Sequence, residues 1–175
     1  MPRRPVVLVV VAALAALAYA WTARGGDGAP AGGPPGATGD VLRGRVVRVT
    51  DGDTIRVALS NRSERVRYIG IDTPEEVRPD TPVQCYARRA AAENARLVAG
   101  RQVRLVLDAD ARDRFGRLLA YVYRADDGLF VNAALVRGGF ARTLTIAPNV
   151  RFAGRFAALA RQARRAGRGL WGACA

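Results

Sequence analysis

The stretch that decides the fold is VLRGRVVRVTDGDTIRVALSNRSERVRYIGI, residues 41–71. It contains three runs rich in β-branched residues, at 41–50, 54–59 and 65–71, and such runs are typical of strands. The first two runs are separated by Asp-Gly-Asp, and Asp-Gly between strand-like runs indicates a hairpin turn. The polar segment SNRSE separates the second run from the third. The stretch therefore predicts three consecutive strands in a meander.

The remainder of the folded part contains helical and strand-like segments in a definite order. Residues 83–100 are helix formers that end at a glycine, which indicates a helix. Strand character returns at 101–108 and 118–125, and helices are predicted from about 132 to 139 and over 151–167. Five short strands with a helix after the third indicate an OB-type five-stranded β-barrel with three α-helices, an α+β fold that is mainly β. A doubly wound sheet is disfavoured because strands and helices do not alternate.

The composition limits the chemistry and the partner. The chain has 28 basic residues, all of them arginine, against 15 acidic ones, and no histidine, which gives a formal charge of +13. Such a charge favours a polyanionic partner such as nucleic acid, although an anionic membrane or cell-wall polymer would satisfy the same electrostatics. Without histidine, the usual general base and transition-metal ligand are missing. Hydrolysis would have to use carboxylates, arginines and a hard cation.

The amino-terminal 40 residues are predicted to lie outside the fold. Residues 1–21 contain two arginines, an apolar run and the small-x-small sequence Ala18-Tyr19-Ala20, which is typical of a secretory signal peptide. An uncleaved membrane anchor is the alternative. Residues 22–40 are rich in Gly, Pro and Ala and indicate a flexible linker before a domain at 41–175. We therefore expect a secreted protein, extracellular or in the cell envelope, or one anchored with its domain outside.

The segment YIGIDTPEE, residues 68–76, concentrates polar groups at a strand end. The strand delivers Asp72, Pro74 forces the chain out of regular structure, and Glu75 follows in the bend. Carboxylates at such places often serve only to cap turns. Arg67 precedes Asp72 by five residues, so the strand would carry its guanidinium into the same neighbourhood.

A second charged segment is DARDRFGR, residues 110–117, before the next strand. It places Asp113, Arg114 and Arg117 around Gly116 at a predicted corner. An arginine fixed beside a glycine bend can bind a phosphate with two parallel hydrogen bonds. Each of these side chains alone is a surface charge, but together with Arg67 they indicate a site.

Four motifs in order resemble those of the thermonuclease family, also called staphylococcal nuclease-like. They are DGDT at 51–54, R-x4-DTPE at 67–75, DRFGR at 113–117 followed by LAYVY, and NAALVRGG at 132–139. The resemblance extends over residues 41–171. It implies an OB-type barrel with three helices and calcium-dependent cleavage of phosphodiester bonds in DNA or RNA.

The resemblance also implies how the carboxylates are used. It assigns Ca²⁺ to the carboxylates of Asp53 and Asp72 and to the backbone carbonyl of Thr73. This agrees with the preference of Ca²⁺ for hard oxygen ligands, and the scissile phosphate and water would complete the shell. Glu75 corresponds to the general base that takes a proton from the attacking water.

The arginines receive the substrate. By the resemblance, Arg67 and Arg117 bind the phosphate and neutralise the charge that develops on it. Arg114 and Phe115 are candidate nucleotide-binding residues, Phe115 standing where the family often has tyrosine. The segment FARTLTIAPN has threonine and alanine where family members often have aromatic rings. The affinity or preference for a nucleotide base is therefore expected to be weaker or to depend on other residues.

Two cysteines, Cys85 and Cys174, complete the candidate set. A pair of cysteines in an exported chain suggests a disulfide, with two free buried thiols as the alternative. The pairing would tie the carboxyl-terminal segment to the first helix.

Two functions from different classes remain at this stage. The first is a secreted calcium-dependent nuclease of little sequence specificity, acting as a monomer. The second is a catalytically inactive OB-type module that binds nucleic acid or another polyanion. The carboxylates favour the enzyme, because a binder needs arginines but not Asp53, Asp72 and Glu75. Non-specific phosphate contacts are expected from the arginines of the last helix, which are Arg151, Arg155, Arg161, Arg164, Arg165 and Arg168.

Overall fold

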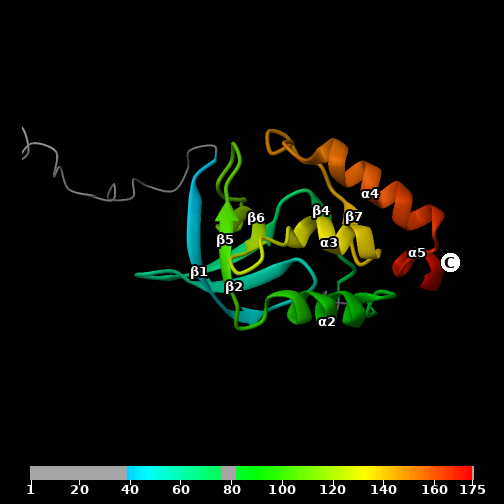
Figure 1. The fold of residues 1–175 in the computed structure, drawn as a ribbon, viewed down its shortest axis with the longest axis horizontal. Helices are drawn as coiled ribbons and strands as arrows, with labels where there is room; N and C mark the ends of the chain where they lie inside the picture. The colour runs from blue at the N-terminus through cyan, green and yellow to red at the C-terminus, as the bar shows by residue number, and fades with distance from the viewer. Residues whose placement is uncertain (1–38, 76–81, 175) are drawn as a thin grey trace, which may run out of the picture. The chain divides into compact units, whose positions relative to one another are not determined.

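The core of the fold is a closed barrel of five strands (Figure 1). The computed structural model describes residues 39–75 and 82–174. In the barrel the strands follow the order β1-β2-β3-β6-β5, and β1 pairs with β5 to close it. The pairing of β3 with β6 is parallel, and the other barrel pairs are antiparallel. The barrel strands are β1 (Val41–Val49), β2 (Thr54–Ala58), β3 (Ser63–Tyr68), β5 (Gln102–Val106) and β6 (Leu118–Arg124).

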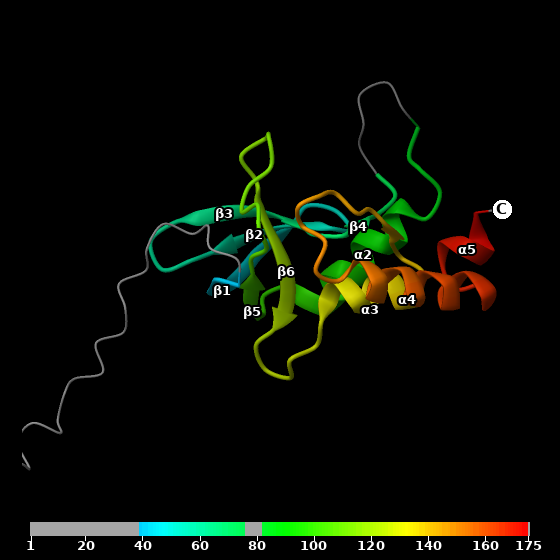
Figure 2. The ribbon, with the colours of Figure 1, turned by 90° about the horizontal axis from the view of Figure 1, so that it is seen from above.

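The helices gather on one side of the barrel, opposite the hairpin that joins β2 to β3 (Figures 1 and 2). They are α2 (Ala87–Val98), α3 (Val131–Gly138), α4 (Ala153–Arg165) and the short α5 (Leu170–Ala173). A two-residue ladder joins β4 (Ile71–Asp72) to β7 (Arg142–Thr143). The OB-type five-stranded barrel is thus confirmed, with its three main helices. The structure adds α5 and the β4–β7 ladder, which the sequence did not predict.

Side chains inside the barrel and under the helices form one apolar core. Val57, Val66 and Leu105 are fully buried on the inner faces of the strands. A cluster of aromatic rings connects α4 with the barrel, with Tyr121 and Phe152 in edge-to-face contact at 4.6 Å between ring centroids. Offset and edge-to-face ring pairs add to the stability gained from burial. The barrel is therefore a rigid support for the loops at its rim.

The beginning of the fold lies slightly before the first strand. The N–H of Gly39 donates to the carbonyl of Leu107, and the N–H of Leu107 donates to the carbonyl of Asp40. The last two residues of the predicted linker thus belong to the folded part. The predicted signal or anchor at 1–21 and most of the linker lie outside the described residues. Within 39–75 and 82–174, no helix combines the length and apolarity needed to cross a bilayer.

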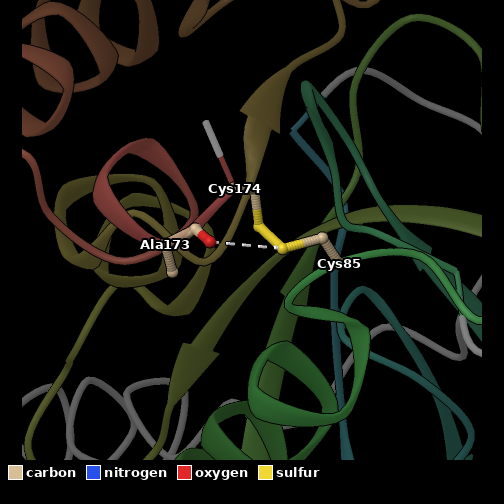
Figure 3. Close-up of a disulfide and its surroundings, with 3 residues drawn as sticks. All are labelled: Cys85, Ala173 and Cys174. Atoms are coloured by element: carbon tan, nitrogen blue, oxygen red, sulfur yellow. Dashed lines mark hydrogen bonds between the residues drawn. A yellow bond between two sulfur atoms is a disulfide. The ribbon is translucent and has the colours of Figure 1, made fainter.

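A disulfide joins Cys85 to Cys174, as the pair of cysteines suggested (Figure 3). Cys85 lies two residues before α2, and Cys174 directly follows α5. Their Cα atoms are 5.9 Å apart. The bridge fixes the carboxyl-terminal segment to the start of the α2 helix.

Candidate active site

The Asp51-Gly52-Asp53 turn is held from both sides by hydrogen bonds. The Asp51 carboxylate accepts the backbone N–H of Asp53 at 3.0 Å, and this contact within the turn explains the aspartate there. From α2, the Asn94 side-chain amide donates to the carbonyl of Asp51 at 2.9 Å. Tyr68 donates its hydroxyl to Asn94 and so fixes that amide. The turn therefore has one orientation relative to β3 and α2.

The turn packs directly against Thr73, and this contact buries Asp53. A Cβ atom at Gly52 would lie 2.6 Å from the hydroxyl oxygen of Thr73, so only glycine fits there. The Asp53 side chain is 5% exposed. Its Oδ2 atom accepts the backbone N–H of Thr73 at 2.7 Å and the Thr73 hydroxyl at 3.0 Å. One carboxylate oxygen of Asp53 thereby joins the turn to Thr73, the residue that follows β4.

Arg67 brings two carboxylates to a single guanidinium. Its Nη1 atom lies 2.7 Å from Asp53 Oδ2, and its Nη2 atom lies 2.8 Å from Asp72 Oδ1. Nη1 also donates to the carbonyl of Ile71 at 3.0 Å. The proposed calcium ligands Asp53 and Asp72, which are 19 positions apart in sequence, are therefore neighbours in space. The Asp72 side chain is 47% exposed, so this pair faces solvent on one side.

The electrostatics of the pair suit an additional cation. Burial raises the pKa of the Asp53 carboxyl to about 7, and the negative charge of Asp51 adds to that rise, while Arg67 and the Thr73 hydrogen bonds oppose it. A further positive charge next to Asp53 would favour its ionised form. Within residues 39–75 and 82–174, no three acidic, histidine or cysteine side chains form a metal cluster. A cation here would be held by Asp53, Asp72 and Thr73 oxygen atoms, with water or phosphate oxygens completing the shell, a donor set that fits a hard ion.

Glu75 is fixed through its backbone by Gln84. The N–H of Glu75 donates to the side-chain oxygen of Gln84 at 3.0 Å, and the N–H of Gln84 donates to the carbonyl of Glu75 at 3.1 Å. Within the described residues, no hydrogen bond or ion pair involves the Glu75 carboxylate. The carboxylate is half-buried and available to accept a proton.

Arg117 is presented by the turn that Asp113 organises. Asp113 Oδ1 accepts the backbone N–H groups of Phe115 and Arg117 at 2.9 Å, and Oδ2 accepts Arg117 Nε at 2.6 Å. Gly116 adopts φ +75°, the left-handed region that glycine tolerates best. The terminal nitrogens of Arg117 have no partner in the part of the chain that the structure describes. They are free to bind an anion.

Arg67 and Arg117 line one cavity of about 550 Å³ together with the predicted nucleotide-binding residues. Phe115 is 65% exposed. The guanidinium carbons of Arg114 and Arg117 lie 4.8 and 5.4 Å from the Phe115 ring centroid. An exposed flat ring with two guanidiniums near it offers both apolar and cationic contact to a nucleotide.

The carboxylates lie beside this cavity and not in its wall. None of Asp53, Asp72, Thr73 and Glu75, all of them described residues, belongs to its lining. Arg67 connects the two groups, because it lines the cavity and binds both aspartates. The predicted residues thus form one region with an arginine part and a carboxylate part.

An ion-pair network around the largely buried carboxylate of Glu64 supports the loop that carries Arg117. Arg112 donates to both carboxylate oxygens of Glu64 on β3, at 2.7 and 3.1 Å, and to the carbonyl of Gly116 at 2.7 Å. Arg62 adds a contact to Glu64 at 2.7 Å. The Arg112 hydrogen bond, with help from Arg62, holds the pKa of Glu64 below its usual range, although burial opposes it.

This network is expected to contribute stability that acid removes. Because the pKa of Glu64 is lower in the folded protein, its contribution is complete above the ordinary value of 4.5 and is lost as the pH falls through the folded value. Glu64→Gln should cost roughly 1 kcal/mol at neutral pH and flatten the decline of stability below pH 4.5. Urea unfolding from pH 3 to 7 measures this. If the free energy of unfolding of the variant depends on pH as that of the wild type does, the ionisation of Glu64 does not contribute to stability.

Several supporting residues were missed from the sequence. Asn94 could have been found from the sequence, because an asparagine on the buried face of a helix needs a specific hydrogen-bond partner. No local sequence pattern could have identified Gln84, Glu64 and Arg112, because the fold determines which residues they contact.

The fold and site together define an OB-type barrel protein with arginines that line one cavity and carboxylates that lie beside it. A family model described as "Staphylococcal nuclease homologue" matches residues 65–173. A protein named "Thermonuclease" from Staphylococcus hyicus is 38% identical over 127 residues, covering 73% of this chain and 74% of that protein. Another from Staphylococcus intermedius is 42% identical over 107 residues, covering 61% and 62%. "Endonuclease YncB" from Bacillus subtilis (strain 168) is 40% identical over 111 residues, covering 62% and 52%.

The chain therefore belongs to the staphylococcal nuclease homologue family, as its motifs predicted. The relatives support a nuclease that hydrolyses nucleic acid. The chain spans less than two thirds of the second and third relatives. The family model begins at Arg65, so the DGDT turn with Asp53 lies outside the matched residues. The role of Asp53 stays a prediction, and its ion pair with Arg67 places it beside Asp72.

Proposed function

We propose that this chain is a calcium-dependent endonuclease that cleaves DNA or RNA with little sequence specificity. The observation that carries the proposal is the position of Arg67, which binds Asp53 and Asp72 and also lines the cavity with Arg117. Carboxylates for a cation and arginines for a phosphate are thus adjacent. The family membership supports hydrolysis as the reaction.

A calcium ion held by Asp53, Asp72 and the Thr73 carbonyl would add positive charge beside the scissile phosphate. Arg117, whose terminal nitrogens are free, binds the phosphate oxygens. Arg67 adds a second guanidinium on the same side of the cavity. Preorganised donors of this kind stabilise the charge of a five-coordinate phosphorus. Glu75 takes the proton of the attacking water.

The lining of the cavity supports weak base discrimination. Leu144 and Ile146 give it an apolar wall next to Phe115. The side-chain amide of Asn149 also lines it, but both amide atoms bind the backbone of Asp110. Apolar surfaces accept any base face, whereas sequence readout needs free donors and acceptors. The phosphate contacts would therefore dominate affinity.

Export is part of the proposal. Residues 1–21 have the pattern of a signal peptide or anchor, and the Cys85–Cys174 disulfide suits an oxidising compartment. The protein would act as a monomer outside the cytoplasm, free or held at the membrane surface.

The proposal is tested by a matched pair of aspartate variants. Asp51→Asn keeps the oxygen that accepts the Asp53 N–H, so we expect Ca²⁺ affinity and cleavage close to wild type. Asp53→Asn removes a charged ligand and should weaken Ca²⁺ binding roughly tenfold or more, with a parallel loss of cleavage. Calorimetric Ca²⁺ titration and degradation of single-stranded DNA and RNA, with Ca²⁺ or with chelator, provide the two measurements.

The same experiment separates the enzyme from a binding module. Undegraded substrate with and without Ca²⁺, together with tight salt-sensitive binding, would identify an inactive polyanion-binding module. Equal effects of the two variants on Ca²⁺ affinity would remove Asp53 from the cation site.

A further inference from the structure

A second hollow, of about 260 Å³, lies outside the cavity described above. It is built from β7, α4 and α5, and its polar lining consists of Arg142, Thr143, Arg161, Arg164 and Trp171. Ala157 and Ala160 complete the lining. Three arginines and a hydroxyl at one small hollow make it cationic and supply hydrogen-bond donors. Such a lining suits an anion with several acceptor oxygens.

Ion pairs do not neutralise the three arginines among the described residues, and Asp72, which lies opposite Arg142, is paired with Arg67. Within residues 39–75 and 82–174, none of Arg142, Arg161 and Arg164 forms an ion pair with a carboxylate. The sequence has no acidic residue from Arg151 onward, so α4 and α5 add no negative charge of their own. Three like charges in one hollow repel each other, and an anion would relieve that repulsion.

Trp171 orders the hollow. The guanidinium carbons of Arg142 and Arg164 lie 5.1 and 5.7 Å from its ring centroid, which fixes both side chains before any ligand arrives. Its indole Nε1 is a buried side-chain donor without a hydrogen-bond partner in the described part of the chain. Buried donors normally find an acceptor. The ring of Trp171 therefore places two cations at the hollow.

The strand pairing places the hollow next to the carboxylate part of the site. Arg142 on β7 is the direct partner of Asp72 on β4 in the antiparallel ladder. Side chains of directly opposed residues lie on the same face, with Cβ atoms about 5 Å apart. A polynucleotide with a phosphate bound at Arg67 would thus pass close to Arg142.

We propose that this hollow binds one backbone phosphate of a polynucleotide, beyond the phosphate that is cleaved. This inference rests on the proposed nuclease function and extends its substrate to a chain longer than a dinucleotide. The arginines of the hollow come from both β7 and α4. Their convergence on one hollow favours a single bound phosphate over diffuse contact along α4.

The test measures binding by the full chain carrying Glu75→Gln, in Ca²⁺, so that cleavage does not interfere. The probes are a fluorescein-labelled single-stranded DNA of about 16 nucleotides, a dinucleotide, and inorganic phosphate as competitor.

Arg164→Gln should weaken binding of the long DNA about tenfold, the effect expected for one charge-assisted contact. Dinucleotide binding should not change. Arg165→Gln, the adjacent exposed residue outside the hollow, is the matched control and should change the long-DNA Kd less than about twofold.

The salt dependence identifies the kind of contact. Loss of one phosphate contact lowers the slope of log K against log salt by about 0.7 for a single strand. Arg161→Gln, which leaves the Trp171 ring contacts intact, should give the same decrease as Arg164→Gln, and the double variant should give no further decrease in slope. Inorganic phosphate should compete only at concentrations far above those of the DNA.

Three results would overturn the inference. Equal losses for Arg164→Gln and Arg165→Gln would show diffuse binding along α4. A slope decrease of about 1.4 in the double variant would show two separate phosphates. Inorganic phosphate competing as well as DNA would make the ligand a free anion. If the Glu75→Gln parent binds neither the long DNA nor the dinucleotide, the proposed nuclease function fails together with this inference. The first three results overturn only the inference, because in each of them the parent still binds DNA.

Discussion

Replacing Glu75 by glutamine is expected to lower the rate of phosphodiester cleavage by roughly 10²- to 10⁴-fold, the usual contribution of a general base. Glutamine has the same shape but cannot take a proton from water. The fold should be unaffected, because Gln84 holds only the backbone of Glu75 and the carboxylate has no partner among the described residues. Initial rates on single-stranded DNA in Ca²⁺, together with DNA affinity and thermal unfolding, measure the effect.

Two controls isolate the role of Glu75. Glu93→Gln removes a carboxylate that pairs with Arg96 on the surface of α2 and should retain full activity. Gln84→Met removes the oxygen that accepts the Glu75 N–H and should lower kcat more than it raises KM. In a Glu75→Gln background, Gln84→Met should have no further effect if it acts through Glu75. Wild-type activity of Glu75→Gln would exclude the general-base role.

Removing the disulfide is expected to produce the largest loss of stability. Cys85 and Cys174 are 89 positions apart, and the chain-entropy model assigns a loop of that size roughly 4 to 5 kcal/mol. Small domains are typically stable by only about 5 to 15 kcal/mol, so this loss is a large share of the total. Urea unfolding of the Cys85→Ser/Cys174→Ser double variant should show it. The oxidised protein should have no titratable thiols when denatured.

Reductant provides the control for this prediction. It should destabilise the wild type to the level of the double variant and leave the double variant unchanged. A difference below about 1 kcal/mol between oxidised wild type and the double variant would show that the native contacts of α5 hold the segment without the bridge.

The sequence predicted those parts of the fold that have local periodicity. The five barrel strands and three main helices each repeat their apolar residues over several turns or pleats, so they were predictable. The β4–β7 ladder has two residues on each strand and α5 has four, too few to show a period. The β4–β7 ladder places Arg142 opposite Asp72, and α5 brings Trp171 to the second hollow.

The candidate site was predictable as a set of residues but not as an arrangement. Motif order identified Asp53, Arg67 and Arg117. That Arg67 would join Asp53 to Asp72 depends on the register of β2 with β3, which sets Arg67 opposite Thr54, and on the contact between the turn and Thr73. The second hollow collects residues from three elements, so no local sequence pattern could have revealed it.

The disulfide also determines how the protein would respond to mechanical force. It closes a covalent ring from Cys85 to Cys174 that contains Arg117 and every residue of the second hollow, while Asp53, Arg67 and Glu75 lie on the open chain before it. Tension applied at the two chain ends can extend the open part but cannot pull the ring apart. Under load the carboxylates and Arg67 would therefore be displaced first, while the ring stays covalently closed around Arg117 and the second hollow.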